Sequence, residues 1–273
     1  MNPEKAIAFV KRDGNDVECA RLGVLLEEKE PSREIIARLF AVQRPDGGWA
    51  PFWAQDYSSL DATCFRLAQA EQLGIGEAEP AIRRAVAFLA ERQVSDGSWQ
   101  EDDSVAGVAP PWATPGQLPA TLYLTANCGL WLALLSDKVD LPSRAAAYLQ
   151  EHLGDDGQLP GFLHTHWLAG AMWHKLRRQE PAERAFTYLS ERIGDLASSN
   201  LSWLITTLSA AGVPAHHNLV SEAASLLARA QEDDGRWRSE DGPTQDVHAT
   251  LGRFFMSGDL LLAPGPAHGL RGQ

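Results

Sequence analysis

The phrase Gln-x-x-Asp-Gly-x-Trp occurs three times in this chain, and it constrains the fold more than any other feature of the sequence. The copies occupy residues 43–49, 93–99 and 231–237. A fourth stretch, residues 154–159, keeps the Asp-Gly pair but ends in leucine where tryptophan would stand. Recurrence of this kind indicates a repeat architecture, in which one structural unit packs on copies of itself.

Each copy follows a segment whose apolar residues recur with helical spacing, such as Ile35, Ile36, Leu39 and Phe40 before the first copy. The Asp-Gly pair is a turn signal that ends this helix. A second, less charged segment follows each turn, and its composition predicts a helix that is buried on most sides. These second segments begin near residues 16, 60, 119, 162, 200 and 246.

The paired segments predict six helical hairpins, of which the first is short and spans residues 4–10 and 16–26. Strand-like alternation is nearly absent, so the fold class is all-α. An array of hairpins forms either an open superhelix or a closed ring. The low charge of the second helices favours closure, which predicts an (α/α)6 toroid with inner and outer helix rings. We expect one domain over residues 1–262 and a flexible, Pro- and Gly-rich tail over residues 263–273.

The composition narrows the function classes. The net charge is −12, whereas duplex nucleic acids and anionic membranes are bound by basic surfaces. The three cysteines form no Cys-x-x-Cys pair, so a thiolate zinc site is not expected. The N-terminus lacks a signal-peptide pattern, and the longest apolar run, residues 130–135, is too short to span a membrane. We therefore expect a cytoplasmic protein with neither a nucleic-acid partner nor a membrane span.

The three phrases resemble the QW repeats of squalene and terpene cyclases and of protein prenyltransferase β subunits. The resemblance extends through the repeats over nearly the whole chain, and both families are α/α toroids. Physically, a glutamine amide at a helix end can bond to free helix carbonyls, while the tryptophan covers apolar surface between repeats. Trp49, Trp99 and Trp237 are therefore expected to be structural rather than catalytic.

Class II terpene cyclases carry an Asp-x-Asp-Asp-Thr-Ala phrase, whose middle aspartate protonates an alkene or an epoxide. The similar phrase here is Ser59-Leu-Asp61-Ala-Thr63, in which Ser59 and Ala62 replace the flanking acids. The resemblance implies that Asp61 is the proton donor, and burial in an apolar cavity would keep such an acid protonated. The alternative is that Asp61 is only an N-terminal helix cap.

The position equivalent to Asp61 can be found in every repeat. The six residues are Asp16, Asp61, Tyr123, His164, Asn200 and Asp246. In a closed ring they would lie at one level near the mouth of the cavity. They form either a polar ring around that mouth or a set of helix caps, although caps explain Tyr123 and His164 poorly. The catalytic candidates are Asp61, Asp246 and His164.

Aromatic rings can stabilise carbocations through their quadrupoles. Candidates to line the cavity include Phe65, Tyr123, Trp131, Trp167 and Trp203, although a helix-spaced aromatic residue is often simply part of the core. The polar substrate-binding candidates are His248, Asp16 and Asn200. Trp53 and Trp112 lie in long insertions that could form a lid.

Three functions follow from these features. The leading hypothesis is a terpene-cyclase-like isomerase that protonates an isoprenoid or another apolar polyene in a central cavity. A prenyltransferase-like enzyme would need zinc, and Asp16, Cys19 and His248 could meet across the ring, but the Asp-x-Cys spacing of that family is missing. No metal and no other cofactor is therefore expected. The third hypothesis is a non-catalytic toroid that binds a lipophilic ligand or a partner.

Overall fold

The computed structural model describes residues 2–27 and 29–252, so the predicted tail, residues 263–273, lies outside the described part. This part contains twelve α-helices, four short 3-10 helices and no strand. The outer helices are α1 (Pro3–Asp13), α3 (Arg33–Phe40), α5 (Pro80–Glu91), α7 (Asp140–Glu151), α9 (Gln179–Ser190) and α11 (Asn218–Arg229). The inner helices are α2 (Asp16–Glu27), α4 (Leu60–Gln72), α6 (Leu118–Leu135), α8 (Leu163–Lys175), α10 (Ser198–Ala210) and α12 (Asp246–Gly252). The 3-10 helices are η1 (Asp103–Val105), η2 (Pro111–Ala113), η3 (Ile193–Asp195) and η4 (Pro243–Gln245).

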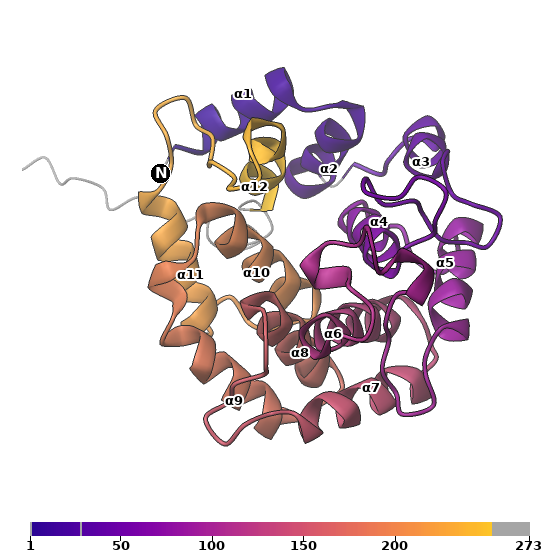
Figure 1. The fold of residues 1–273 in the computed structure, drawn as a ribbon. Helices are drawn as coiled ribbons and strands as arrows, with labels where there is room; N and C mark the ends of the chain where they lie inside the picture. Colours follow the sequence, from indigo (N-terminus) through magenta and orange to yellow (C-terminus); the bar gives the residue numbers. More distant parts are fainter. Residues whose placement is uncertain (1, 28, 253–273) are drawn as a thin grey trace, which may run out of the picture.

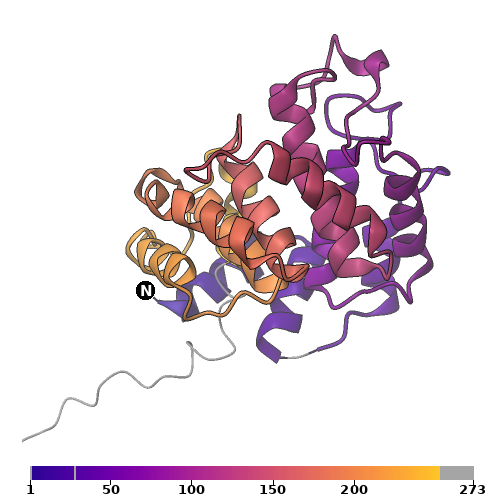
Figure 2. The same cartoon turned by 90° about the horizontal axis from the view of Figure 1, so that it is seen from below.

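The helices form a closed ring (Figure 1). Each inner helix contacts the next one, and α12 contacts both α1 and α2 at the seam where the end of the array meets its beginning. The prediction of an all-α toroid with inner and outer helices is confirmed. Figure 2 shows that the segment between α5 and α6 rises above one face of the ring.

Helix α6 is the most apolar of the inner helices, and its middle is buried almost continuously. Among the described residues it is the one helix whose length and composition would suffice to cross a membrane, which the short apolar run of residues 130–135 did not suggest. However, 78% of that window is buried inside the protein. Its hydropathy is therefore explained by packing against α4, α7 and α8.

The glutamine of each repeated phrase links two parts of the ring. Gln43 Nε2 donates to the carbonyl of Gly47 in its own turn, at 2.9 Å, and to the carbonyl of Ala81 in α5, at 2.8 Å. Gln93 and Gln231 make the equivalent pairs of bonds. The acceptors are thus not the free carbonyls of a helix end, as the sequence suggested, but carbonyls of the turn and of the start of the next outer segment.

The glycine of each phrase is required by its backbone conformation. Gly97 has a φ of +97°, and a Cβ atom there would lie 2.7 Å from the carbonyl oxygen of Arg144 in α7. The turn thus packs directly on the backbone of the next outer helix. The tryptophans that follow are buried, and Trp99 Nε1 donates to the carbonyl of Leu89 at 2.8 Å. The expectation that these tryptophans are structural is confirmed.

Candidate functional site

Asp61 is the second residue of α4, directly after the N-terminus of the helix. The cap is Ser59, whose hydroxyl accepts the Ala62 N–H at 3.1 Å. The alternative that Asp61 is a helix cap is therefore wrong, because a cap precedes the first helical residue. The Asp61 carboxylate instead bonds to side chains of other segments.

Three donors surround this carboxylate. Tyr123 Oη donates to Asp61 Oδ1 at 2.7 Å, and Asn127 Nδ2 faces the same oxygen at 3.4 Å. Trp112 Nε1, from η2 in the segment above the ring, donates to Oδ2 at 3.2 Å. Tyr123 and Trp112 thus come from two parts of the chain that the sequence had singled out separately. The segment that the sequence suggested as a lid thus contacts the acid through Trp112.

Asn127 was not among the residues predicted from the sequence, whereas Trp131 was one of the aromatic candidates. Trp131 Nε1 donates to Asn127 Oδ1 at 3.0 Å, which turns the Asn127 amide nitrogen toward Asp61. Both side chains are buried in α6. With Tyr123 they occupy every fourth position of a helix that has no charged residue, so they lie on one face. That spacing is a signal that could have identified Asn127.

Burial raises the pKa of Asp61 above the ordinary value of an aspartate. The hydrogen bonds from Tyr123, Trp112 and Asn127 act in the opposite direction but do not cancel the effect of burial. No cationic side chain contributes to the shift. Asp61 therefore holds its proton to a higher pH than a free carboxyl does, while part of its surface stays accessible. An acid of this kind can deliver a proton to a weakly basic group.

A second buried carboxylate, Glu101, lies at the N-terminus of the same helix. It accepts hydrogen bonds from the Ser59 hydroxyl at 2.8 Å, the Leu60 N–H at 2.9 Å and the Tyr57 hydroxyl at 2.9 Å. Both hydroxyls also accept a backbone N–H, so each uses its single proton toward Glu101. Burial raises the pKa of Glu101, and these donors oppose that shift. Glu101 therefore fixes the first turn of α4 and with it the backbone that carries Asp61.

Four of the six residues predicted at one level of the ring do form a continuous arc. Asp61 bonds to Tyr123, whose ring lies 6.3 Å from the ring of His164. His164 in turn forms a hydrogen bond with Asn200, which by itself would raise the pKa of the imidazole. Burial is the larger effect and lowers the pKa of His164, so the imidazole is held in its neutral form.

The aromatic candidates near this arc differ in exposure. The ring of His164 lies 5.0 Å from Trp167 and 5.1 Å from Trp203, measured between centroids. Trp167 is completely buried, whereas Trp203 is only partly buried. Trp167 therefore packs against Trp203 and His164 from within the core, and its own ring is not accessible to a ligand.

The structure places the remaining two ring positions outside the arc. Asp16 is exposed on α2 and pairs with Arg38 of α3. Asp246 is buried, its Oδ1 accepts the Ser239 N–H at 2.7 Å, and its Oδ2 lies 3.3 Å from Arg236. Neither side chain caps its helix, and the partners of both belong to segments other than α4. Their arrangement is that of structural ion pairs.

The other polar candidate, His248, lies at the seam of the ring. Its Nε2 is 3.2 Å from Glu18 Oε1, and its Nδ1 is 3.0 Å from Arg21. Asp16 and Cys19 do not join it, since Cys19 Sγ faces backbone carbonyls and Asp16 pairs elsewhere. Within residues 2–27 and 29–252, no three His, Cys, Asp or Glu side chains converge as a metal site would require.

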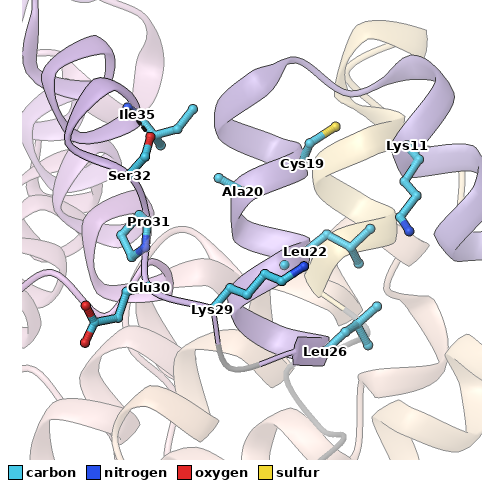
Figure 3. A pocket seen from close by; sticks show the side chains of 11 residues that line it. Lys11, Cys19, Ala20, Leu22, Leu26, Lys29, Glu30, Pro31, Ser32 and Ile35 are labelled. Carbon is cyan, nitrogen blue, oxygen red and sulfur yellow. Dashed lines mark hydrogen bonds between the residues drawn. The ribbon is translucent and has the colours of Figure 1, made fainter.

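A pocket of about 420 Å³ lies between α2 and α3. Figure 3 shows Cys19 and Leu22 on one side of it and Pro31 and Ile35 on the other. It does not include Asp61, so a central cavity around the acid stays a prediction.

The closed ring of hairpins and the acid at the start of an inner helix define a toroid of the terpene cyclase type. The chain belongs to the squalene-hopene cyclase C-terminal domain family, whose pattern matches residues 16–167. The resemblance inferred from the QW phrases is thereby confirmed.

Solved structures show the same fold. A variant of the type II terpene cyclase MstE from Scytonema, in complex with its substrate geranylgeranyl dihydroxybenzoate, matches with a TM-score of 0.60 and 14% identity, over 93% of this chain and 94% of that one. A protein from Actinoplanes matches with a TM-score of 0.63 and 17% identity, over 93% and 96%. Another MstE variant, bound to the product merosterolic acid A, matches with a TM-score of 0.61 and 14% identity, over 93% and 94%. No curated protein sequence matches the chain.

Proposed function

We propose that this protein is a terpene-cyclase-like isomerase, in which Asp61 protonates an isoprenoid or another apolar polyene and thereby starts its cyclisation or isomerisation. The observation that carries the proposal is the environment of Asp61, a partly buried acid with a raised pKa, no cationic partner and three hydrogen-bond donors. The relatives named MstE are type II terpene cyclases, which supports this choice of reaction class.

The hydrogen bonds assign a role to each carboxyl oxygen. Oδ1 faces both Tyr123 and Asn127, so the acid proton resides on Oδ2, where Trp112 is the single donor. In the reaction the Oδ2–H bond breaks, a C–H bond forms at an alkene carbon, and a carbocation remains on the substrate. The Asp61 carboxylate left behind is stabilised by the same three donors. Loss of a proton from the cation to a base ends the reaction.

Aromatic side chains near the acid suit a cationic intermediate. Trp203 and Phe65 keep exposed ring surface and could face the charge. The neutral imidazole of His164 lies beside Trp203 and could accept the proton that is released at the end. Asp246, which is paired with Arg236, is less suited to this role.

The experiment is incubation of the purified chain with farnesyl diphosphate, geranylgeranyl diphosphate and squalene, followed by product analysis with mass spectrometry. Cyclised or isomerised products that disappear in Asp61→Asn support the proposal. Conversion only in the presence of zinc and a second acceptor substrate would favour the prenyltransferase-like alternative. Tight binding of these compounds without turnover would favour a non-catalytic toroid.

A further inference from the structure

Two arginines on the inner helices bond only to neutral side chains. Arg21 in α2 is 4% exposed, its Nη1 lies 3.0 Å from His248 Nδ1, and its Nε has no partner. Arg66 in α4 is half-buried, and its Nη1 donates to Gln69 Oε1 at 2.8 Å. In the part of the chain that the structure describes, neither guanidinium forms a salt bridge. Buried cations are normally paired with anions, because burial removes the water that stabilises their charge.

The imidazole of His248 cannot supply the missing negative charge. Its Nε2 faces the Glu18 carboxylate, so Nε2 carries the proton and Nδ1 accepts from Arg21. Burial and the charges of Arg21 and Arg66 lower the pKa of His248 to about 3, so the ring is neutral. Arg66 lies on the same side of the ring, since its Cζ is 6.0 Å from the centroid of Phe65 and that ring is 5.8 Å from the ring of His248, which Arg21 contacts.

Two carboxylates near Arg21, those of Glu18 and Glu71, balance the positive charge of the two arginines only in part. Glu18 offsets one of the two positive charges, although its oxygens contact His248 and the Asn15 N–H, the latter at 2.7 Å, rather than a guanidinium. Glu71 acts on Arg21 through space, but burial raises the pKa of Glu71 to about 7, so near neutral pH it carries only part of its negative charge. The four charged groups therefore leave a positive excess at this place.

An exposed apolar ring connects this cationic cluster with the acid. Phe65 is 48% exposed although it belongs to an inner helix, and its centroid lies 5.8 Å from the ring of His248. It follows Asp61 by one helical turn, so both side chains lie on the same side of α4. Along the inside of the ring, the acid Asp61 is thus followed by the apolar ring of Phe65 and then by the two arginines.

We propose that Arg21 and Arg66 bind the oxyanion head group, a phosphate or a carboxylate, of an amphiphilic isoprenoid whose apolar part lies on Phe65 toward Asp61. A planar guanidinium presents paired N–H donors that match both kinds of oxyanion. The orientation of the ligand rests on the proposed function, since it assumes that the apolar part is what Asp61 protonates. The binding of the head group does not depend on turnover.

The test is calorimetric titration of the full chain with inorganic pyrophosphate and, separately, with benzoate. We expect at least one of them to bind, and Arg66→Gln to weaken that binding by about tenfold or more, the effect of losing a hydrogen bond to a charged group. The matched control is Arg229→Gln, which removes an exposed arginine from the outer helix α11. Circular dichroism checks that each variant folds. If Arg66→Gln does not fold, Arg66→Lys replaces it, and we expect that variant to lose an intermediate part of the affinity. The stronger probe tells which oxyanion is preferred.

A second arm compares geranylgeranyl diphosphate with the neutral alcohol geranylgeraniol, using quenching of tryptophan fluorescence. Wild type and Asp61→Asn should both prefer the diphosphate, and Arg66→Gln should lose most of that preference. The inference is overturned if neither pyrophosphate nor benzoate binds, or if Arg66→Gln and Arg229→Gln behave alike. Turnover of a neutral polyene without oxyanion binding would refute this inference but not the proposed function. Oxyanion binding without any turnover would refute the proposed function but not this inference.

Discussion

Tyr123 donates its phenolic proton to Asp61 Oδ1 across 2.7 Å, and this bond joins the inner helices α4 and α6 at the acid. The donor favours the ionised form of the carboxylate, since it lowers the pKa that burial raises. The pKa of Asp61 thus depends on burial, which raises it, and on three hydrogen-bond donors, which lower it. Removing one donor by mutation should therefore change this pKa.

Replacing Tyr123 with phenylalanine should raise the pKa of Asp61 further, because the largest opposing hydrogen bond is lost. A general acid works while it is protonated, so activity falls as pH rises through its pKa. The falling limb of the pH profile of kcat/KM should therefore move to higher pH in Tyr123→Phe, while the maximal rate decreases because the acid is weaker. A profile whose limb stays in place or moves to lower pH would contradict this assignment.

Asp61→Asn should abolish turnover and leave the fold intact. The free energy of unfolding should change by no more than about 1 kcal/mol, since Ser59 rather than Asp61 caps the helix. Asp16→Asn should keep most of the activity, because that residue is exposed. Asp246→Asn should be intermediate in activity and less stable by about 1–3 kcal/mol, since a buried carboxylate loses its charge-assisted bonds. Product analysis and urea unfolding of the three variants measure these effects, and full activity of Asp61→Asn would remove the acid from the proposal.

Glu71→Gln should change how stability depends on pH. The pKa of Glu71 is about 7 in the folded protein, against an ordinary value of 4.5, so the folded state binds the proton more tightly. Wild type therefore loses stability as pH rises from about 4.5 through about 7, by about 1–3 kcal/mol after allowance for partial solvent exposure. Urea unfolding at pH 4.5 and pH 8 should show a smaller loss in Glu71→Gln. The exposed Glu222→Gln is the control, and equal losses in all three proteins would refute the prediction.

Gly97→Ala should destabilise the ring more than an alanine at another left-handed glycine. Its Cβ would meet the Arg144 carbonyl at 2.7 Å, whereas a Cβ at Gly74, with a φ of +70°, meets nothing within 4 Å. Gly74→Ala should therefore cost about 1 kcal/mol of backbone strain, and Gly97→Ala clearly more. Thermal unfolding of the two variants compares them directly, and equal costs would mean that the turn can move away from α7.

Much of the fold could be predicted because its signals are local. Inner helices expected near residues 119, 162 and 200 begin at Leu118, Leu163 and Ser198. Helical periodicity and turn residues decide these boundaries within a few positions of the chain. The same local reasoning placed Tyr123 and His164 at the level of Asp61, where the structure brings them together.

The parts of the site that could not be predicted depend on contacts between distant segments. Glu101 lies in a loop without periodicity and reaches Leu60 across 41 positions of the sequence. Arg21 meets His248 across 227 positions. The sequence left open whether Asp61 caps its helix, because a one-residue shift at a helix start changes which side chain faces the free N–H groups, and the structure gives Ser59 as the cap.

The bond between Gln231 and Asn2 has a consequence for how the protein is made. Gln231 Nε2 donates to the Asn2 carbonyl at 3.0 Å, across 229 positions of the chain. Helix α1 is synthesised before the turn that holds it and before the helix α12 on which it packs. Contacts between the two ends of a chain are slow to form, since a long loop must close before they contribute. We therefore expect the slowest kinetic phase of folding to be the docking of α1 on α12 and on the turn at Gln231, which closes the ring.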